Sequence, residues 1–207
     1  LSIGEVTIAT LQSIAVHQLP AVLMRYAQAY PRNRVEILER SGTIVTEAVR
    51  QGQADFGIHI QQDPHADLSE DLLMRDPFVL VCSAHHKLAK SASVDWSELK
   101  GTDLITLGGS SGNRRLVEVQ LARSGLETRG RFVVESTPTA VALASTGIGV
   151  AILPATMKAS RNASGLIEVP IVNPVIHRSI SLVRRRNQAL TPAAAALFAL
   201  LTTELTR

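Results

Sequence analysis

The sequence has one cysteine and few aromatic residues, which make up 3% of its 207 residues. A single cysteine excludes an internal disulfide. Cys82 ends the apolar run Phe78–Cys82, so we expect a buried, reduced thiol. No apolar run is long enough to cross a bilayer, so the sequence predicts a soluble, cytoplasmic protein without a membrane partner.

The sequence also lacks the spacings that metal and nucleotide sites require. His85 and His86 are adjacent, so their side chains point apart, and His59, His65 and His177 have no ligand spacing. No glycine-rich loop of the phosphate-binding type is present. The sequence therefore predicts no metal and no cofactor.

Basic residues exceed acidic ones only slightly, for a formal net charge of +3. They are spread along the chain except for Arg184–Arg186, which we interpret as a solvated strand end rather than a nucleic-acid site.

The chain opens with Leu1–Gly4, neither an initiator methionine nor a signal peptide, so we expect it to begin at a cut or a domain junction.

The first sixty residues alternate strand and helix patterns. Ser13 is a residue type that caps helices, and apolar residues then recur at helical spacing until Pro31. We expect Ile44, Val45, Ala48 and Val49 to face inward from a second helix. The predicted order is strand Glu5–Thr10, a helix from Ser13, strand Val35–Leu38, a helix opened by Ser41–Thr43, and strand Ala54–Ile58.

A second alternating series follows a predicted surface loop, Gln61–Asp71, and the strand Phe78–Cys82. Asp95 and Glu98 are spaced as a capping box on a short helix. The later elements are strand Asp103–Leu107, a helix stopped by Gly125, strand Phe132–Val134, helix Thr139–Ser145, strands Val150–Leu153, Leu166–Val169 and Ser179–Val183, and a last helix capped by Thr191 with Pro192 in its first turn. Such alternation predicts an α/β protein with parallel sheets, whose ligands bind outside the carboxyl ends of the strands.

Five motifs follow one another along the chain, namely Gly4–Ala9, Leu19-Pro20 with Tyr26 and Tyr30-Pro31, Gly52–Ile58, His86–Ala89, and Gly147–Pro154. In this order they resemble the effector-binding domain of LysR-type transcriptional regulators. The chain departs from the family pattern at three places: Ala9 stands where the family usually has glycine, the loop Arg32–Arg34 is longer than usual, and His85–Lys87 lacks the usual proline.

The resemblance implies a type-2 periplasmic-binding-protein-like fold of two Rossmann-like lobes joined by two crossover strands. Lobe I would comprise residues 1–82 plus 171–207, and lobe II residues 83–170. Both lobes would bind a small effector in the cleft between them. The resemblance also implies self-association as dimers and tetramers, and DNA binding only through an N-terminal winged helix-turn-helix that this chain does not contain.

The effector site follows from both the chemistry and the resemblance. Hydroxyls and free N–H groups at helix N-termini hold a small organic anion without burying a second charge. The candidate residues at strand ends and helix starts are Gln12, Ser13, Ser41, Thr43, His59, Ser110, Ser111 and Thr137.

Each candidate also has a purely structural interpretation. Ser13, Ser111 and Thr137 could serve only as helix N-caps, since a cap and a ligand contact use the same hydroxyl. His59 could be a hydrogen-bonded structural histidine. We expect Asn113, Arg114 and Arg115 to be exposed helix residues, unless an arginine reaches an anion.

Two other functions stay open. A solute-binding protein of a transporter would share the fold. Gly108–Gly112 reads Gly-x-Ser-x-Gly between a strand and a helix, as in serine hydrolases that would use Ser110. That triad needs a downstream acid and then a histidine. His177 is the only later histidine, and it lies in a proline-bearing connection. No aspartate follows Asp103, which leaves Glu118, Glu127, Glu135 or Glu168 as the acid, and three of these four lie in predicted helix or strand interiors or caps. We therefore expect a sensor without catalytic residues.

Overall fold

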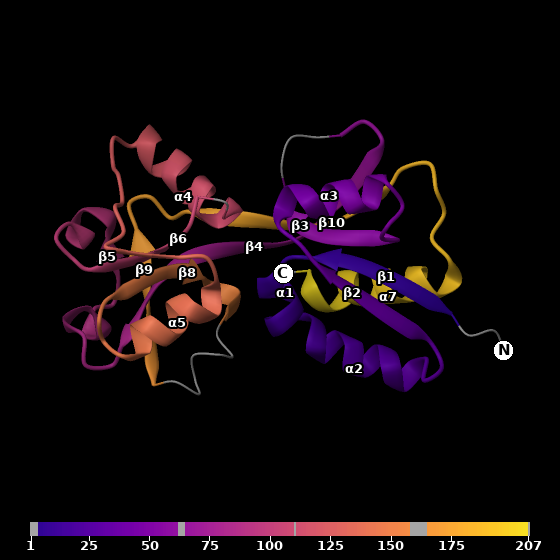
Figure 1. Ribbon diagram of the computed structural model, residues 1–207, viewed down its shortest axis with the longest axis horizontal. Helices are drawn as coiled ribbons and strands as arrows, with labels where there is room; N and C mark the ends of the chain where they lie inside the picture. Colours follow the sequence, from indigo (N-terminus) through magenta and orange to yellow (C-terminus); the bar gives the residue numbers. More distant parts are fainter. Residues whose placement is uncertain (1–3, 62–64, 110, 158–164, 207) are drawn as a thin grey trace. The chain divides into compact units, whose positions relative to one another are not determined.

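A computed structural model describes residues 4–61, 65–109, 111–157 and 165–206. The chain forms two compact units, Leu1–Arg75 with Ser179–Arg207, and Asp76–Arg178 (Figure 1). The boundaries fall inside two long strands, β4 (Leu68–Ser83) and β10 (His177–Arg185). Residues 76–82 and 171–178 thus belong to the second unit, whereas the sequence boundaries assigned them to the first lobe.

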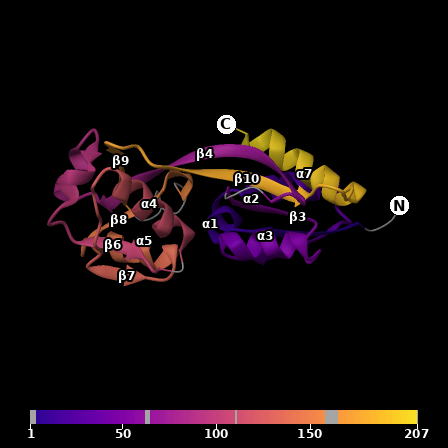
Figure 2. The same ribbon diagram turned by 90° about the horizontal axis from the view of Figure 1, so that it is seen from above.

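The first unit is built on a mixed sheet with strand order β2-β1-β3-β10-β4, to which β4 contributes its first half. The strands β1 (Glu5–Thr10), β2 (Arg34–Glu39) and β3 (Phe56–Ile60) are parallel, and β10 is antiparallel to β3. The helices are α1 (Gln12–His17), α2 (Leu19–Ala29), α3 (Gly42–Arg50) and α7 (Pro192–Leu205). Figure 2 shows α3 on one face of the sheet and α7 on the other.

The predicted first helix is two helices. Their break lies at Gln18, because Pro20 has no N–H to donate to the carbonyl of Val16. The N-cap prediction for Ser13 was wrong: Leu11 occupies the N-cap position, and Ser13 is 9% exposed within the first turn of α1.

Helix α3 packs on the sheet through Val45, Ala48 and Val49, which share a core cluster with Ala9 of β1. The expectation that Ile44 faces inward was wrong, since it is 51% exposed. Thr46 is buried instead, and its hydroxyl contacts His59 on β3. A buried polar pair therefore replaces an apolar contact that the periodicity alone favoured.

Replacing Gly57 by alanine is expected to destabilise the first unit. A Cβ at this position of β3 would lie 2.7 Å from Val45 Cγ1 and 3.1 Å from Val49 Cγ2. Overpacking of this kind costs about 1–3 kcal/mol of the free energy of unfolding, measurable by urea denaturation. Gly109→Ala is the matched control, because its Cβ would meet nothing within 4 Å. Equal losses for the two variants would contradict the close packing of α3 on β3.

The second unit is built on a sheet with strand order β4-β8-β6-β7. The strands β6 (Leu104–Leu107), β7 (Phe132–Val134) and β8 (Val150–Pro154) are parallel to one another, and β8 is antiparallel to β4. The strand β9 (Leu166–Val172) also pairs with β4, and β5 (Val94–Asp95) pairs with β9.

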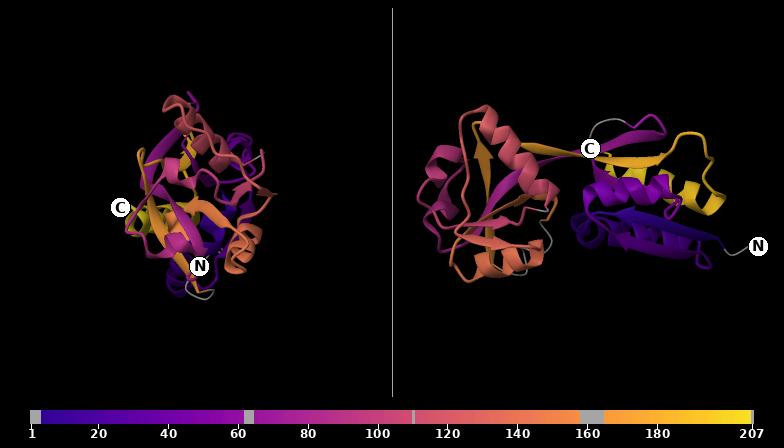
Figure 3. Two further views of the ribbon diagram at one scale, coloured as in Figure 1. Left: turned by 90° about the vertical axis from the view of Figure 1, so that its left-hand side faces the viewer. Right: turned by 45° about the horizontal axis from the view of Figure 1, so that its top comes forward.

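Two cores lie on opposite sides of this second sheet. Helix α4 (Gly112–Arg123) covers one side together with the 3-10 turns η1 (Lys87–Lys90) and η2 (Trp96–Leu99). Helix α5 (Thr137–Ser145) and the turn η3 (Ala155–Met157) cover the other (Figure 3). The unit is thus a three-layer α/β structure, and its strands and helices alternate as the sequence predicted.

Three local predictions can be compared with the structure. The capping box is confirmed: the Asp95 carboxylate accepts the Ser97 N–H at 2.9 Å, and the Asp95 N–H donates to Glu98 at 2.7 Å. The Thr191 cap of α7 is also confirmed. The loop prediction for Gln61–Asp71 was wrong at its end, because β4 already begins at Leu68, whose side chain is buried in the first unit's core.

Cys82 is a free, buried thiol, as expected, and burial raises its pKa. In the part of the chain that the structure describes, no helix is both long and apolar enough to span a bilayer.

Candidate functional site

In the first unit, two helices begin where two parallel strands end. Thr10 at the end of β1 pairs with Glu39 at the end of β2, and the Arg40 N–H donates to the Thr10 carbonyl at 2.9 Å. Helix α1 follows β1 and α3 follows β2, so both N-termini lie at one edge of the sheet. This edge carries the predicted residues Gln12, Ser13, Ser41 and Thr43.

Ser41 is the N-cap residue of α3, yet its side chain makes no capping hydrogen bond. Thr43, in the first turn, is exposed. The first N–H groups of a helix have no partner within the helix. The start of α3 therefore offers a ligand backbone donors and two hydroxyls, and the positive end of the helix dipole favours an anion there.

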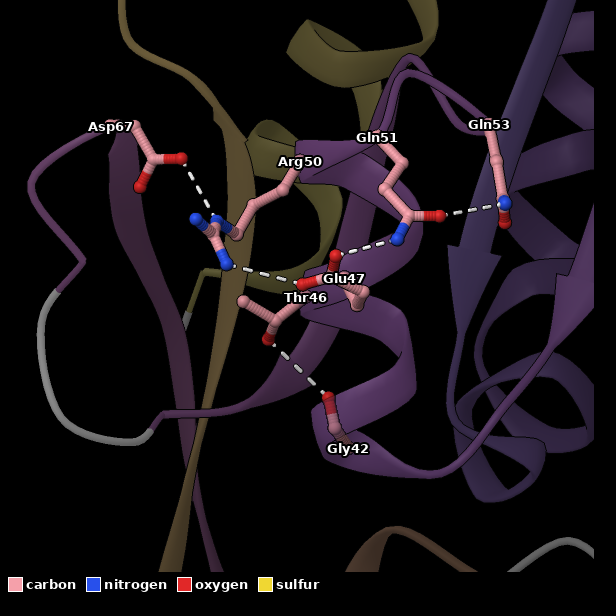
Figure 4. A network of polar contacts seen from close by, with 7 residues as sticks. All are labelled: Gly42, Thr46, Glu47, Arg50, Gln51, Gln53 and Asp67. Carbon is pink, nitrogen blue, oxygen red and sulfur yellow. Dashed lines mark hydrogen bonds and ion pairs between the residues drawn. The ribbon is translucent and has the colours of Figure 1, made fainter.

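Polar contacts hold the rest of α3 in place (Figure 4). The Arg50 guanidinium donates to Asp67 at 2.9 Å and to Glu47 at 3.2 Å, and its hydrogen bond lowers the pKa of Asp67. Nearer the N-terminus, the Thr46 hydroxyl donates to the Gly42 carbonyl at 3.4 Å. The two ion pairs of Arg50 are exposed, so each contributes little to the free energy of unfolding.

His59 is fully buried on β3 rather than exposed at the edge. Its Nδ1 lies 3.2 Å from the Thr46 hydroxyl, and its Nε2 lies 3.4 Å from the Glu70 carboxyl. Burial, followed by the charge of His65, lowers the pKa of His59 to about 4, whereas burial raises the pKa of Glu70. The imidazole is thus neutral at pH 7, so its contact with Glu70 is not an ion pair. This geometry favours the structural interpretation of His59.

The second unit has a corresponding edge. Leu107 at the end of β6 pairs with Val134 at the end of β7, and the Gly108 N–H donates to the Val134 carbonyl at 2.8 Å. Helices α4 and α5 start directly after these strands. The predicted Ser111 and Thr137 therefore belong to one edge, and Ser110 lies outside the described residues.

The two caps of this edge differ from each other. Ser111 is the N-cap of α4, and its hydroxyl accepts the Arg114 N–H at 3.5 Å. The N-cap possibility for Thr137 was wrong: Ser136 caps α5 by accepting the Thr139 N–H at 3.4 Å. Thr137 is the first residue of the helix and is nearly buried.

A buried ion pair next to this edge was missed by the sequence analysis. Arg178 and Asp76 are both fully buried, and Arg178 Nε donates to Asp76 Oδ2 at 2.8 Å. The guanidinium also donates to the Thr156 hydroxyl at 3.2 Å and to the Asn113 amide oxygen at 3.3 Å. Burial lowers the pKa of Arg178, and Asp76 opposes that shift. The sequence gives little indication of this pair: Asp76 and Arg178 are each a charged residue just before a predicted apolar strand.

The first turn of α4 is more enclosed than predicted. Asn113 and Arg114 are half-buried, and only Arg115 is exposed. Arg114 donates to Glu118 at 2.6 Å and to the Leu107 carbonyl at 3.1 Å. The expectation of exposed residues was therefore wrong for two of the three.

The basic run Arg184–Arg186 lies at the end of β10, as predicted, but it is only partly solvated: Arg184 and Arg185 are half-buried, and Arg186 is exposed. Arg184 lies over the ring of Phe198, 5.5 Å from its centroid. Arg185 donates to the carbonyls of Val49 and Ala54, and Arg186 donates to the Leu68 carbonyl at 2.7 Å. The three guanidinium groups thus interact with a ring and with backbone carbonyls of the first unit, which argues against a nucleic-acid site there.

Among the described residues, no three histidine, cysteine, aspartate or glutamate side chains lie close enough to hold a metal ion.

Comparison with known proteins gives a consistent result. The family model of the LysR substrate binding domain matches residues 1–206. The chain is 35% identical over 198 residues to the HTH-type transcriptional regulator YbhD of Escherichia coli, covering 96% of this chain and 62% of YbhD. It is 34% identical over 195 residues to the regulator YfeR of Shigella flexneri, covering 94% of this chain and 63% of YfeR. The chain thus spans less than two thirds of these relatives.

Solved structures with a similar fold include effector-binding domains. The QuiR domain with shikimate has a TM-score of 0.83 at 19% identity, covering 99% of this chain and 98% of that one. The BenM domain with benzoate has a TM-score of 0.84 at 22% identity, covering 98% and 92%. The CcmR regulatory domain with 2-PG, from Synechocystis, has a TM-score of 0.87 at 19% identity, covering 99% and 98%.

Proposed function

Since the chain belongs to the LysR substrate-binding domain family, the effector-binding part of LysR-type transcriptional regulators, we propose that its effector is a small organic anion. The observation that carries this proposal is the start of α3. Ser41 occupies the N-cap position there, but its hydroxyl makes no capping hydrogen bond. Shikimate, bound in the QuiR structure, and benzoate, the effector of BenM, are carboxylates, which supports the same ligand class.

Each unit by itself offers proposed contacts at its own sheet edge. In the first unit they are Ser41 and Thr43 with the first N–H groups of α3, and Gln12 at the exposed start of α1. In the second unit they are Ser111 and the first N–H groups of α4. Thr137, Ser13 and His59 are nearly or fully buried, so they would support these contacts from behind.

The proposed mechanism is a shift between conformations. An effector changes an equilibrium only if it binds one conformation better than another. A preference of about 1–3 kcal/mol is typical of allosteric regulators. In the whole protein, which we expect to be a cytoplasmic dimer or tetramer, this shift would repack the oligomer and change the spacing of DNA-binding domains that lie outside this chain. Identical X-ray scattering of the full-length oligomer with and without saturating effector would contradict this mechanism.

The two alternatives from the sequence have less support. A transporter's solute-binding protein shares the fold, but the family match is to regulators. Effector-binding domains of this family bind small molecules to control transcription, and we propose that this one likewise does not convert its ligand.

Removing the Ser41 hydroxyl is expected to weaken effector binding without weakening the fold. Ser41→Ala deletes one proposed hydrogen bond, which is worth about 1–1.5 kcal/mol, or about a five- to tenfold increase in Kd. Calorimetric titration with an organic acid that stabilises the wild-type chain measures this change. The free energy of unfolding should stay nearly constant, because the hydroxyl makes no capping bond.

Thr191→Ala is the control, since Thr191 does cap its helix by accepting the Ala194 N–H at 3.2 Å. It should cost about 1 kcal/mol of stability and leave the Kd unchanged. If Ser41→Ala binds the acid as tightly as the wild type does, α3 is not part of the site.

A further inference from the structure

A single buried guanidinium connects four elements of the second unit. Arg178 on β10 donates from Nε to Asp76 on β4 at 2.8 Å, and from Nη2 to the Thr156 hydroxyl of η3 at 3.2 Å. Its Nη1 donates to the Asn113 amide oxygen of α4 at 3.3 Å. Arg178 thus joins the start of α4 to the two long strands β4 and β10.

The orientation of this guanidinium is fixed by its partners other than Asn113. Asp76 accepts hydrogen bonds from the Thr156 N–H at 3.0 Å and from the Thr156 hydroxyl at 2.7 Å, in addition to the one from Arg178. The side chains of Arg178 and Asp76 are both 0% exposed. Because the N–H groups of a guanidinium form a rigid planar fork, holding Nε and Nη2 also sets the direction of Nη1. Arg178 therefore offers Asn113 a donor in a fixed place.

Asn113 lies in the part of α4 that the proposed function uses. It is the second residue of the helix, after the N-cap residue Ser111 and Gly112. The first N–H groups of a helix have no partner within the helix, and the ends of helices fray. Asn113 thus contributes one of the proposed anion-binding N–H groups from its backbone, while its side chain is held by Arg178.

We propose that Arg178 is a positioning residue for the anion contacts of the second unit. In this role, which rests on the proposed function, Arg178 does not contact the anion. Its bond to Asn113 orders the first turn of α4 before the ligand arrives. A binding group that is already ordered loses less conformational entropy on binding, so the anion binds more tightly.

The first measurement needs no ligand. NMR relaxation of the 207-residue chain gives order parameters for the backbone N–H groups in the first turn of α4. We expect about 0.85 in the wild type, and a fall toward about 0.6 in Asn113→Ala and in Arg178→Lys. Lysine keeps a positive charge beside Asp76 but lacks the planar fork that reaches Asn113. Gln120→Ala is the matched control, because it removes another half-buried amide from α4, about two turns further on, and should leave the first turn rigid.

The second measurement is the Kd for benzoate, by calorimetric titration. Since benzoate would then have to order the first turn itself, the Kd should rise about fivefold in Asn113→Ala and in Arg178→Lys. Both changes break the same hydrogen bond, so the double variant should bind no more weakly than either single variant. A merely structural role of Arg178 would lower the free energy of unfolding without this shared effect on the Kd.

The positioning role is overturned if the order parameters of the first turn stay unchanged in Asn113→Ala, or fall equally in Gln120→Ala. It is also overturned if the two increases in Kd multiply in the double variant. Failure of the proposed function gives a different result: benzoate would not bind the wild type, or neither Ser41→Ala nor Ser111→Ala would change its Kd. The order parameters, measured without ligand, still decide in that case whether Arg178 orders α4.

Discussion

Arg178→Met is expected to lower the free energy of unfolding by about 3–5 kcal/mol. The substitution leaves the buried Asp76 carboxylate without its guanidinium partner, and it also removes the donors to Thr156 and Asn113. Removing one partner of a buried pair costs more than the pair itself contributes, because a buried charge then remains uncompensated. Urea denaturation followed by circular dichroism measures the loss.

The matched control for this prediction is Arg131→Met in the same unit. Arg131 donates to Asp103 at 2.7 Å, but both side chains are largely exposed, so the loss should stay below about 1 kcal/mol. Equal losses for Arg178→Met and Arg131→Met would show that burial does not make the Arg178 pair special.

Stability is expected to fall by about 3 kcal/mol as the pH drops from 6.5 to 4, because of His59. Its pKa is about 4 in the folded chain and 6.5 when unfolded. Below pH 6.5 the unfolded state therefore binds a proton that the folded state does not, and stability decreases with falling pH. The raised pKa of Glu70 acts in the opposite direction, since its contribution is present at low pH and lost as the pH rises.

The measurement is the free energy of unfolding at several pH values, for the wild type and for His59→Gln. The variant should be less dependent on pH between 6.5 and 4, whatever its absolute stability. Parallel pH profiles for the two proteins would show that His59 is not the group responsible.

Much of the fold could be predicted because it rests on local patterns. The alternation of strand and helix, the capping box at Asp95, and the caps Ser111 and Thr191 all depend on neighbours within a few residues. The break between α1 and α2 also has a local cause, because Pro20 lies in the first turn of α2. The apolar residues recur at helical spacing across the break, so the sequence analysis missed it.

What could not be predicted depends on contacts between distant segments. Asp76 and Arg178 are 102 residues apart, and nothing in either segment indicates its partner. Thr46 is buried and Ile44 is exposed, and the Thr46 hydroxyl contacts the buried imidazole of His59 on another element. The candidate site was predictable in its placement at strand ends, whereas the use of each hydroxyl, capping at Ser111 but not at Ser41, required the structure.

The central claim is that the start of α3 in the first unit and the start of α4 in the second unit each take part in binding organic anions. The most direct measurement is the free energy of unfolding of the 207-residue chain against increasing concentrations of small organic acids, amino acids and aromatic carboxylates. At a hundredfold excess over its Kd, the effector should stabilise the wild type by about 2.7 kcal/mol, and the Ser41→Ala/Ser111→Ala variant clearly less. The claim is contradicted if every acid that stabilises the wild type stabilises this variant equally.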